Sequence, residues 1–171
     1  MYNDPVLSKY INLIKDNMPG VFKWFYQGDP FRIPSTNLPA LIISKSNTLI
    51  GPLTNAEDTH SIGISITVVT DIRNDRDGNN GSNDNIDMTP GIATLYNIIE
   101  GRDDTTYALK AQSILGILRK NQLVDQAYNL RTDLNTLTKA DYGLTMGKRT
   151  AEGYATEGSI DFLANYVQNR N

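Results

Sequence analysis

The strongest pattern in the chain is a strict alternation of apolar and small polar positions between residues 61 and 70. Branched apolar side chains occupy positions 62, 64, 66 and 68, and small residues, mostly hydroxyl-bearing, occupy positions 61, 63, 65 and 67. Because successive side chains of a strand point to opposite faces, this period predicts a long, half-buried antiparallel strand. Ile160, Phe162, Ala164 and Tyr166 alternate with more polar residues in the same way, which predicts a closing strand near the sheet edge.

The first segment follows a helical period instead. Asp4 suits the N-cap, Pro5 suits the first helical position, and Pro19-Gly20 ends the pattern. Between them, apolar residues recur at spacings of three and four, which predicts a helix with one apolar stripe. The stripe consists of Leu7, Tyr10, Ile11, Ile14 and Met18.

A two-helix segment is predicted between Gly91 and Asn121. Pro90 opens the first helix, which runs to about Glu100, and Gly101 ends it. Caps at positions 103–105 predict a second helix, because acidic and hydroxyl side chains satisfy the free N–H groups of a first turn. Its apolar face would consist of Tyr107, Ala111, Ile114 and Leu118, with Arg119 and Lys120 in the last turn.

Shorter apolar runs predict the remaining strands, at 21–26, 40–44, 123–130 and 142–146. Three connections join these elements. Prolines hold 27–39 extended, 47–59 forms a loop or a hairpin arm, and the polar segment 73–89 is a mobile loop or one ordered by a partner.

These elements predict one α+β domain spanning residues 1–171. Its sheet is mostly antiparallel and twisted, with an N-terminal helix, the two-helix segment packed on one face, and long polar loops. The length of 171 residues fits a single domain, and 39% hydrophobic with 20% charged residues fits a soluble folded protein.

Composition excludes several classes of function. The net charge of −3 disfavours sequence-independent nucleic-acid binding, which requires neutralisation of phosphates. The chain has no cysteine and only one histidine, so disulfides and thiolate chemistry are excluded and a histidine triad or metal site is disfavoured. No signal peptide or membrane-spanning run is visible, which predicts a protein used in a cytoplasm or in an assembly formed there.

Two motifs that resemble ligand-binding loops fail on inspection. Asp75, Asp77 and Asn79 copy the start of a calcium-binding EF-hand loop, but Asn80 and Ile86 replace its glycine and its bidentate acid. The run 143–149 has one residue too few between its glycines for a phosphate-binding loop, and Arg149 replaces the required hydroxyl. We therefore expect no metal and no cofactor.

The remaining candidate residues have ordinary structural explanations. His60, near Asp58 and Ser61, is expected to be a polar residue at a strand end. The aromatic run 22–26 is expected to pack in the core with one exposed ring, rather than to stack on bases or sugars. The carboxyl groups of the polar loop lack an environment that would separate their pKa values. They belong to Asp71, Asp75, Asp77, Asp84 and Asp87. We predict no catalytic residues and no enzyme.

The order of segments resembles the tail terminator and tail-completion proteins of tailed bacteriophages. The resemblance covers about residues 1–166. After the N-terminal helix it rests on four segments, which in chain order are FKWFYQGDPFRIPSTNLPALIIS, HSIGISITVVTDIR, GIATLYNIIEGRDDTTYALKAQSILGILRKNQ and GSIDFLANYVQ. Its most distinctive part is the string Gly28, Asp29, Pro30, Ile33, Pro34, Leu38, Pro39 and Ala40.

The resemblance implies a structural protein of the virion, without catalysis and without functional residues to transfer. Its copies would form a ring, typically a hexamer, at the head-proximal end of the tail tube in the neck, after assembly in the host cytoplasm. The ring would stop tube polymerisation and offer a joint to head connector proteins. Implied partners are further copies, the tail-tube protein, neck proteins and, in a contractile tail, the sheath protein. DNA would only pass through the lumen, and no membrane is involved.

Three alternatives remain at this point. The first is a head-completion or connector protein of the same virion, which would bind the portal. The second is a small hydrolase or carbohydrate-binding domain that uses Trp24 and Asp29 of the aromatic segment. The third is a regulatory interaction module of a cell.

Overall fold

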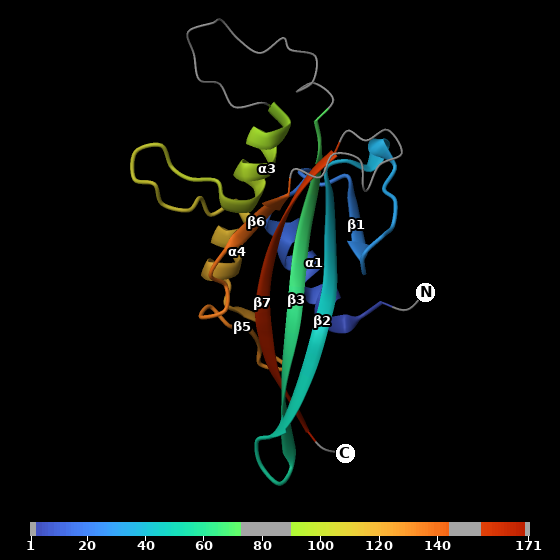
Figure 1. The fold of residues 1–171 in the computed structure, drawn as a ribbon. Helices are drawn as coiled ribbons and strands as arrows, with labels where there is room; N and C mark the ends of the chain where they lie inside the picture. Colours follow the sequence, from blue (N-terminus) through green and yellow to red (C-terminus); the bar gives the residue numbers. More distant parts are fainter. Residues whose placement is uncertain (1–2, 73–89, 144–154, 170–171) are drawn as a thin grey trace, which may run out of the picture.

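The computed structural model describes residues 3–72, 90–143 and 155–169, as drawn in Figure 1. Within these ranges it contains three α-helices, one short 3₁₀ helix and a curled sheet of seven strands. The helices are α1 (Pro5–Asn17), α3 (Pro90–Glu100) and α4 (Ile114–Lys120), and the 3₁₀ helix η1 is Ser35–Asn37. The strands are β1 (Trp24–Gln27), β2 (Ala40–Pro52), β3 (Glu57–Asp71), β4 (Leu123–Asp125), β5 (Leu130–Thr132), β6 (Ala140–Gly143) and β7 (Ala155–Asn169).

The expected fold class is confirmed at the level of an α+β protein with an N-terminal helix and a mostly antiparallel sheet. The strand order is β1-β2-β3-β7-β5-β4, and β6 also pairs with β7. Among the strands that the structure describes, β1 and β2 are the one parallel pair. The predicted segment 73–89 lies outside the described residues.

The N-terminal helix forms as its caps predict. The Asp4 carboxylate accepts hydrogen bonds from the backbone N–H groups of Val6 and Leu7, at 2.9 and 3.1 Å. These bonds satisfy donors that have no partner inside the helix. Leu7, Tyr10, Ile14 and Met18 of the predicted stripe are buried.

Both predicted alternations form long strands whose apolar sides are buried, except that Tyr166 of β7 is only partly buried. β3 and β7 pair over their whole lengths, from Glu57 opposite Asn169 to Asp71 opposite Ala155. The expected edge position of the closing strand is wrong, because β7 lies between β3 on one side and β5 and β6 on the other. Alternation reports that one face is buried, and it contains no information on whether a strand has one neighbour or two.

The second predicted helix begins later than its expected caps at 103–105 indicate, because α4 starts only at Ile114. The Asp103 carboxylate does accept from the N–H groups of Thr105 and Thr106, but it closes a turn. Tyr107 then adopts a φ of +57°, which a right-handed helix cannot contain. The true N-cap is Ser113, whose hydroxyl accepts from the N–H of Gly116 at 3.1 Å.

Three shorter predictions need correction. The strand expected at 21–26 is β1, which begins only at Trp24. The strand expected at 123–130 is a hairpin of β4 and β5, because the Asp125 carboxylate accepts from the N–H of Ala127 and Asn129 adopts a φ of +49°. The strand expected at 142–146 corresponds to β6, which is Ala140–Gly143, and the expected positions 144–146 lie outside the described residues.

The segment 40–59 forms a hairpin arm. The predicted strand at 40–44 continues as β2 to Pro52, so only residues 53–56 connect β2 to β3. Figure 1 shows this arm projecting from the lower end of the molecule.

Two hydrophobic clusters lie on opposite faces of the sheet. The larger cluster joins Ile62, Ile64 and Ile66 of β3 and their neighbours on β7 to buried residues of α1, α3 and α4. The smaller cluster joins Ile33 and Leu38 of the proline-rich connection to β2, β3 and β7. The sheet is therefore covered along one face by the larger cluster and at one end of the other face by the connection.

Candidate assembly surfaces

The hairpin arm presents large apolar side chains to solvent. Leu49 and Ile50 of β2 are 65% and 64% exposed, and Leu53 at the turn is also exposed. Beyond Ile43, the outer side of β2 is paired with no strand that the structure describes. Exposed apolar side chains next to unpaired backbone groups are typical of a surface that binds another chain.

The opposite edge of the sheet carries a second exposed apolar group. Leu123 of β4 is 43% exposed, and Tyr128 in the turn after β4 is also exposed. A mainly apolar pocket of about 310 Å³ lies beside this edge, between the start of α1 and the strands. Its lining includes Val6, Leu130 and Tyr166.

Two ion pairs link α1 and its N-cap to strands near the two opposite edges of the sheet. Lys9 binds Asp125 of β4 at 2.6 Å, and its hydrogen bond and charge lower the pKa of that carboxyl. Near the other side, Asp4 pairs with Lys45 of β2, and the Asp4 backbone N–H donates to the Gln27 side chain at 2.8 Å. Burial favours a higher pKa for Asp4, but Lys45 and the N–H groups of the helix outweigh it and lower the pKa.

The proline-rich connection combines a buried anchor with exposed rings. Ile33 and Leu38 are buried, and the Asn37 side chain donates to the Tyr26 hydroxyl at 2.9 Å. Phe31, by contrast, is 85% exposed, and the Arg32 guanidinium lies 5.9 Å from its ring centroid. An anchored segment that displays an aromatic ring and an arginine has the side chains that dominate many protein interfaces.

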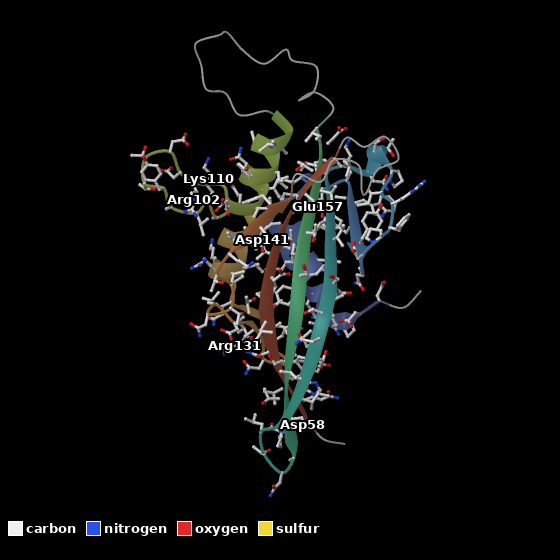
Figure 2. All side chains as sticks on the ribbon, viewed as in Figure 1. Asp58, Arg102, Lys110, Arg131, Asp141 and Glu157 are labelled. Atoms are coloured by element: carbon white, nitrogen blue, oxygen red, sulfur yellow. The ribbon has the colours of Figure 1, made fainter. Side chains whose placement is uncertain are left out.

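The sheet face opposite the helices carries a polar cleft, which borders Ile42 of the smaller cluster. The cleft has a volume of about 420 Å³ and is lined by Ser44, Ser65, Thr67 and Ser159 and by the carboxyl-bearing residues Asp29, Asp141 and Glu157. Figure 2 labels Asp141 and Glu157, which come from β6 and β7. Lys139 pairs with Asp141 at 2.7 Å.

The structure does not bring the candidate triad together. His60 lies inside β3 instead of at its start, is buried, and stacks on Tyr166 with ring centroids 4.5 Å apart. Ser61 is the next residue along the strand, so its side chain points to the other face. Asp58 lies lower on the arm, as Figure 2 shows.

The aromatic segment is arranged as its structural explanation predicts. Phe22 is buried and packs edge-on against Phe25, with centroids 5.6 Å apart. Trp24 is the exposed ring, and Tyr26 packs partly against the smaller cluster.

The loop motifs rejected from the sequence fall largely outside the described residues. Asp71 is described, at the end of β3, whereas Asp75, Asp77, Asn79, Asp84 and Asp87 are not. Of the glycine-containing run, only Gly143 is described. No cluster of metal-ligating side chains occurs in 3–72, 90–143 or 155–169.

Comparisons with known proteins leave the family open. No protein-family model matches the chain, and no curated protein matches it. In the described part of the chain, every helix is too short or too polar to cross a bilayer.

Sequence reasoning missed Leu49, Ile50 and Leu123 as surface residues. Leu49 and Ile50 follow polar residues 46–48 and precede Gly51-Pro52, a context that predicts a loop or a hairpin arm and does not indicate which way their side chains point. The signal that was available is Thr48-Leu49-Ile50 itself, a short run with high strand propensity.

Proposed function

We propose that this chain is a structural protein of a tailed-bacteriophage virion. Its copies form a ring, with six copies as the expected number, that caps the head-proximal end of the tail tube. The ring stops tube polymerisation and forms the joint to the head connector. It assembles in the host cytoplasm and remains in the neck of the virion.

One observation carries the assembly part of this proposal, namely exposed apolar side chains on both edges of a single sheet. Leu49 and Ile50 lie on one edge and Leu123 on the other. Subunits of a ring meet through two different surfaces, one on each neighbour, so each subunit needs two such surfaces. The viral part of the proposal is supported by the order of segments and the string from Gly28 to Ala40.

The two sheet faces fit different environments in such a ring. The helical segments cover one face and would form the outer wall. The other face carries hydroxyl and carboxyl side chains, among them Ser65, Asp141 and Glu157. We assign this face to the lumen, because carboxylates repel phosphates and let DNA pass without binding.

Electron microscopy of the purified chain, alone and with tail tubes of its virus, tests the proposal. We expect discrete rings, or added density at one end of each tube, and tubes that no longer lengthen. Binding to isolated portal, without binding to tubes, would instead assign the chain to the head side of the neck. A protein that stays monomeric at high concentration and binds neither partner would refute both assignments.

A further inference from the structure

The two outer edges of the sheet are available for pairing. The β2 edge is the outer side of residues 47–52, and the β4 edge is the outer side of residues 123–125. No described strand pairs with either edge. β1 pairs with β2 only as far as Ile43, and β4 stands at the end of the strand order. Natural proteins commonly protect such edges with charged side chains, bulges or coverings. The bulge in β2 lies between Lys45 and Asn47, above this stretch, and residues 46–51 carry no charge.

Leu49 and Leu123 lie in one row across the sheet. Leu49 pairs with Ser61 of β3, and Ser61 pairs with Asn165 of β7. Asn165 pairs with Arg131 of β5, which in turn pairs with Leu123. Directly opposed residues project from the same face, so the two exposed leucines share one face and one level at opposite edges.

The directions of the two edge strands also agree. Every step from β2 through β3, β7 and β5 to β4 is antiparallel. Four reversals leave β4 running in the same direction as β2. Copies arranged side by side around an axis along the strands therefore present a β2 edge and a β4 edge in parallel orientation, the same orientation in which β1 pairs with β2.

Charge does not oppose this contact. Asp125 is the charged residue of β4, and it is already paired with Lys9 of its own chain. Arg131, labelled in Figure 2, lies one strand inward in the same row. Since residues 46–51 are uncharged, no like charges meet when the edges approach.

We propose that the β2 edge of one copy pairs in parallel with the β4 edge of the next copy, and that Leu49 contacts Leu123 across this boundary. The inference rests on the proposed function in that its partner is a second copy in a ring. Because the two leucines share one row of the sheet, the contact continues that row from one copy into the next. Such a head-to-tail contact forms a ring when the rotation between copies closes, and a helical filament when it does not.

Disulfide cross-linking tests the contact, since the chain has no cysteine of its own. Neighbouring strands lie about 4.8 Å apart, within the range that a disulfide spans. The full-length chain carrying both Leu49→Cys and Leu123→Cys, oxidised after assembly, should give a ladder of covalent oligomers that reduction abolishes. The control carries Leu49→Cys with Tyr107→Cys, which places the second thiol on an exposed loop, and it should give no ladder.

A charge exchange supplies a second, independent readout. Leu49→Asp alone and Leu123→Lys alone should each weaken assembly at least tenfold in light scattering, and the two changes in one chain should restore it. Both side chains are exposed, so the melting temperature should stay constant in all variants.

The outcomes separate this inference from the proposed function. Wild-type rings without a ladder, or dimers formed by Leu49→Cys alone, would overturn the edge contact and leave the ring proposal standing. A wild-type chain that forms no ring with or without tubes would overturn both.

Discussion

At the scale of single residues, polar groups inside the core connect elements that are distant in sequence. The Tyr10 hydroxyl of α1 and the Thr132 hydroxyl of β5 lie 3.0 Å apart, and both residues are fully buried. The Tyr10 ring also packs against Phe162 of β7, with centroids 5.3 Å apart. Burial opposes the charged phenolate and raises the pKa of Tyr10 to about 12, so the hydroxyl stays protonated at any ordinary pH.

Tyr10→Phe should therefore lower the free energy of unfolding by about 1–2 kcal/mol, because the Thr132 hydroxyl loses its buried partner. Urea denaturation measures the change. Tyr107→Phe is the control, since Tyr107 is 74% exposed, and it should leave stability unchanged. Equal stability of the Tyr10→Phe variant and the wild type would show that this hydrogen bond contributes nothing.

Asp4 makes stability depend on pH in one direction. Its pKa is lowered in the folded chain by Lys45 and the helix N–H groups, which outweigh the effect of burial. The lowered pKa means that the charged carboxylate stabilises the fold at pH values above its unfolded pKa of about 3.9. This stabilisation is lost as the pH falls through the pKa of the folded state. Asp4→Asn keeps a good N-cap but removes the charge.

We expect this variant to be about 1 kcal/mol less stable than the wild type at pH 7. The two stabilities should converge in acid, once the pH has fallen through the lowered pKa of Asp4. Urea midpoints at pH 7 and in acid measure the gap. A gap that stays constant over this range would assign the effect to shape instead of charge.

At the scale of elements, the loop before α4 determines where that helix begins. The Lys110 N–H donates to the Gly101 carbonyl at 2.7 Å, and Asp103 donates its N–H to Ala108 at 2.9 Å. Together with the turn at Tyr107, these bonds fold the loop back on itself, and Figure 2 labels Arg102 and Lys110 on it. The chain then enters α4 at Ser113, so that Ile114, Ile117 and Leu118 reach the core.

Gly116 in the first turn of α4 is required by this arrangement. A Cβ atom there would lie 2.1 Å from the Lys110 carbonyl oxygen, which belongs to the backbone and cannot rotate away. Gly116→Ala should cost about 2 kcal/mol or more in the free energy of unfolding.

Gly51→Ala is the matched control for Gly116→Ala, because no atom lies within 4 Å of its added Cβ. Thermal unfolding of the two variants gives the comparison. Similar melting temperatures for both would mean that the loop moves freely away from α4.

At the scale of the whole molecule, the large exposed apolar side chains of the described residues lie at the sheet edges and in the proline-rich connection, apart from Tyr107 on the loop before α4. The edges carry Leu49 and Leu123, which we assign to contacts between copies. The connection carries Phe31, which is exposed even though Ile33 and Leu38 on either side of the 3₁₀ turn anchor it. An assembled ring that binds a tube needs a surface separate from the contacts between its own subunits. The exposed Phe31 side chain is our candidate for that surface.

Phe31→Ala should weaken binding to tail tubes at least tenfold while leaving ring formation and melting temperature unchanged, since the side chain touches little of its own chain. Co-sedimentation with tubes measures the binding. Tyr107→Ala removes an exposed aromatic ring of similar size from the loop between α3 and α4. This control variant should bind tubes normally. Normal binding by the Phe31 variant would remove the connection from the tube contact.

Much of the local structure could be predicted from the sequence because its causes lie within a few residues. Asp4 and Pro5 start α1 whatever lies around them, and the period of two at 62–68 buries one side of β3. The wrong start predicted for the second helix has the same local origin. Asp103 satisfies the local rule for a cap, and the bonds from Lys110 to Gly101 and from Asp103 to Ala108 that overrule it form only when the loop folds back.

The candidate surfaces depend on pairing between segments that are far apart along the chain. Leu49 and Leu123 share a row only through three intervening strands, whose register comes from the packing of their buried faces. The same packing places β7 in the middle of the sheet and leaves the outer side of β2 beyond Ile43 without a partner strand in the described part of the chain. Local periodicity determines which side of each strand faces the core, whereas neighbours, register and open edges result from the folded sheet as a whole.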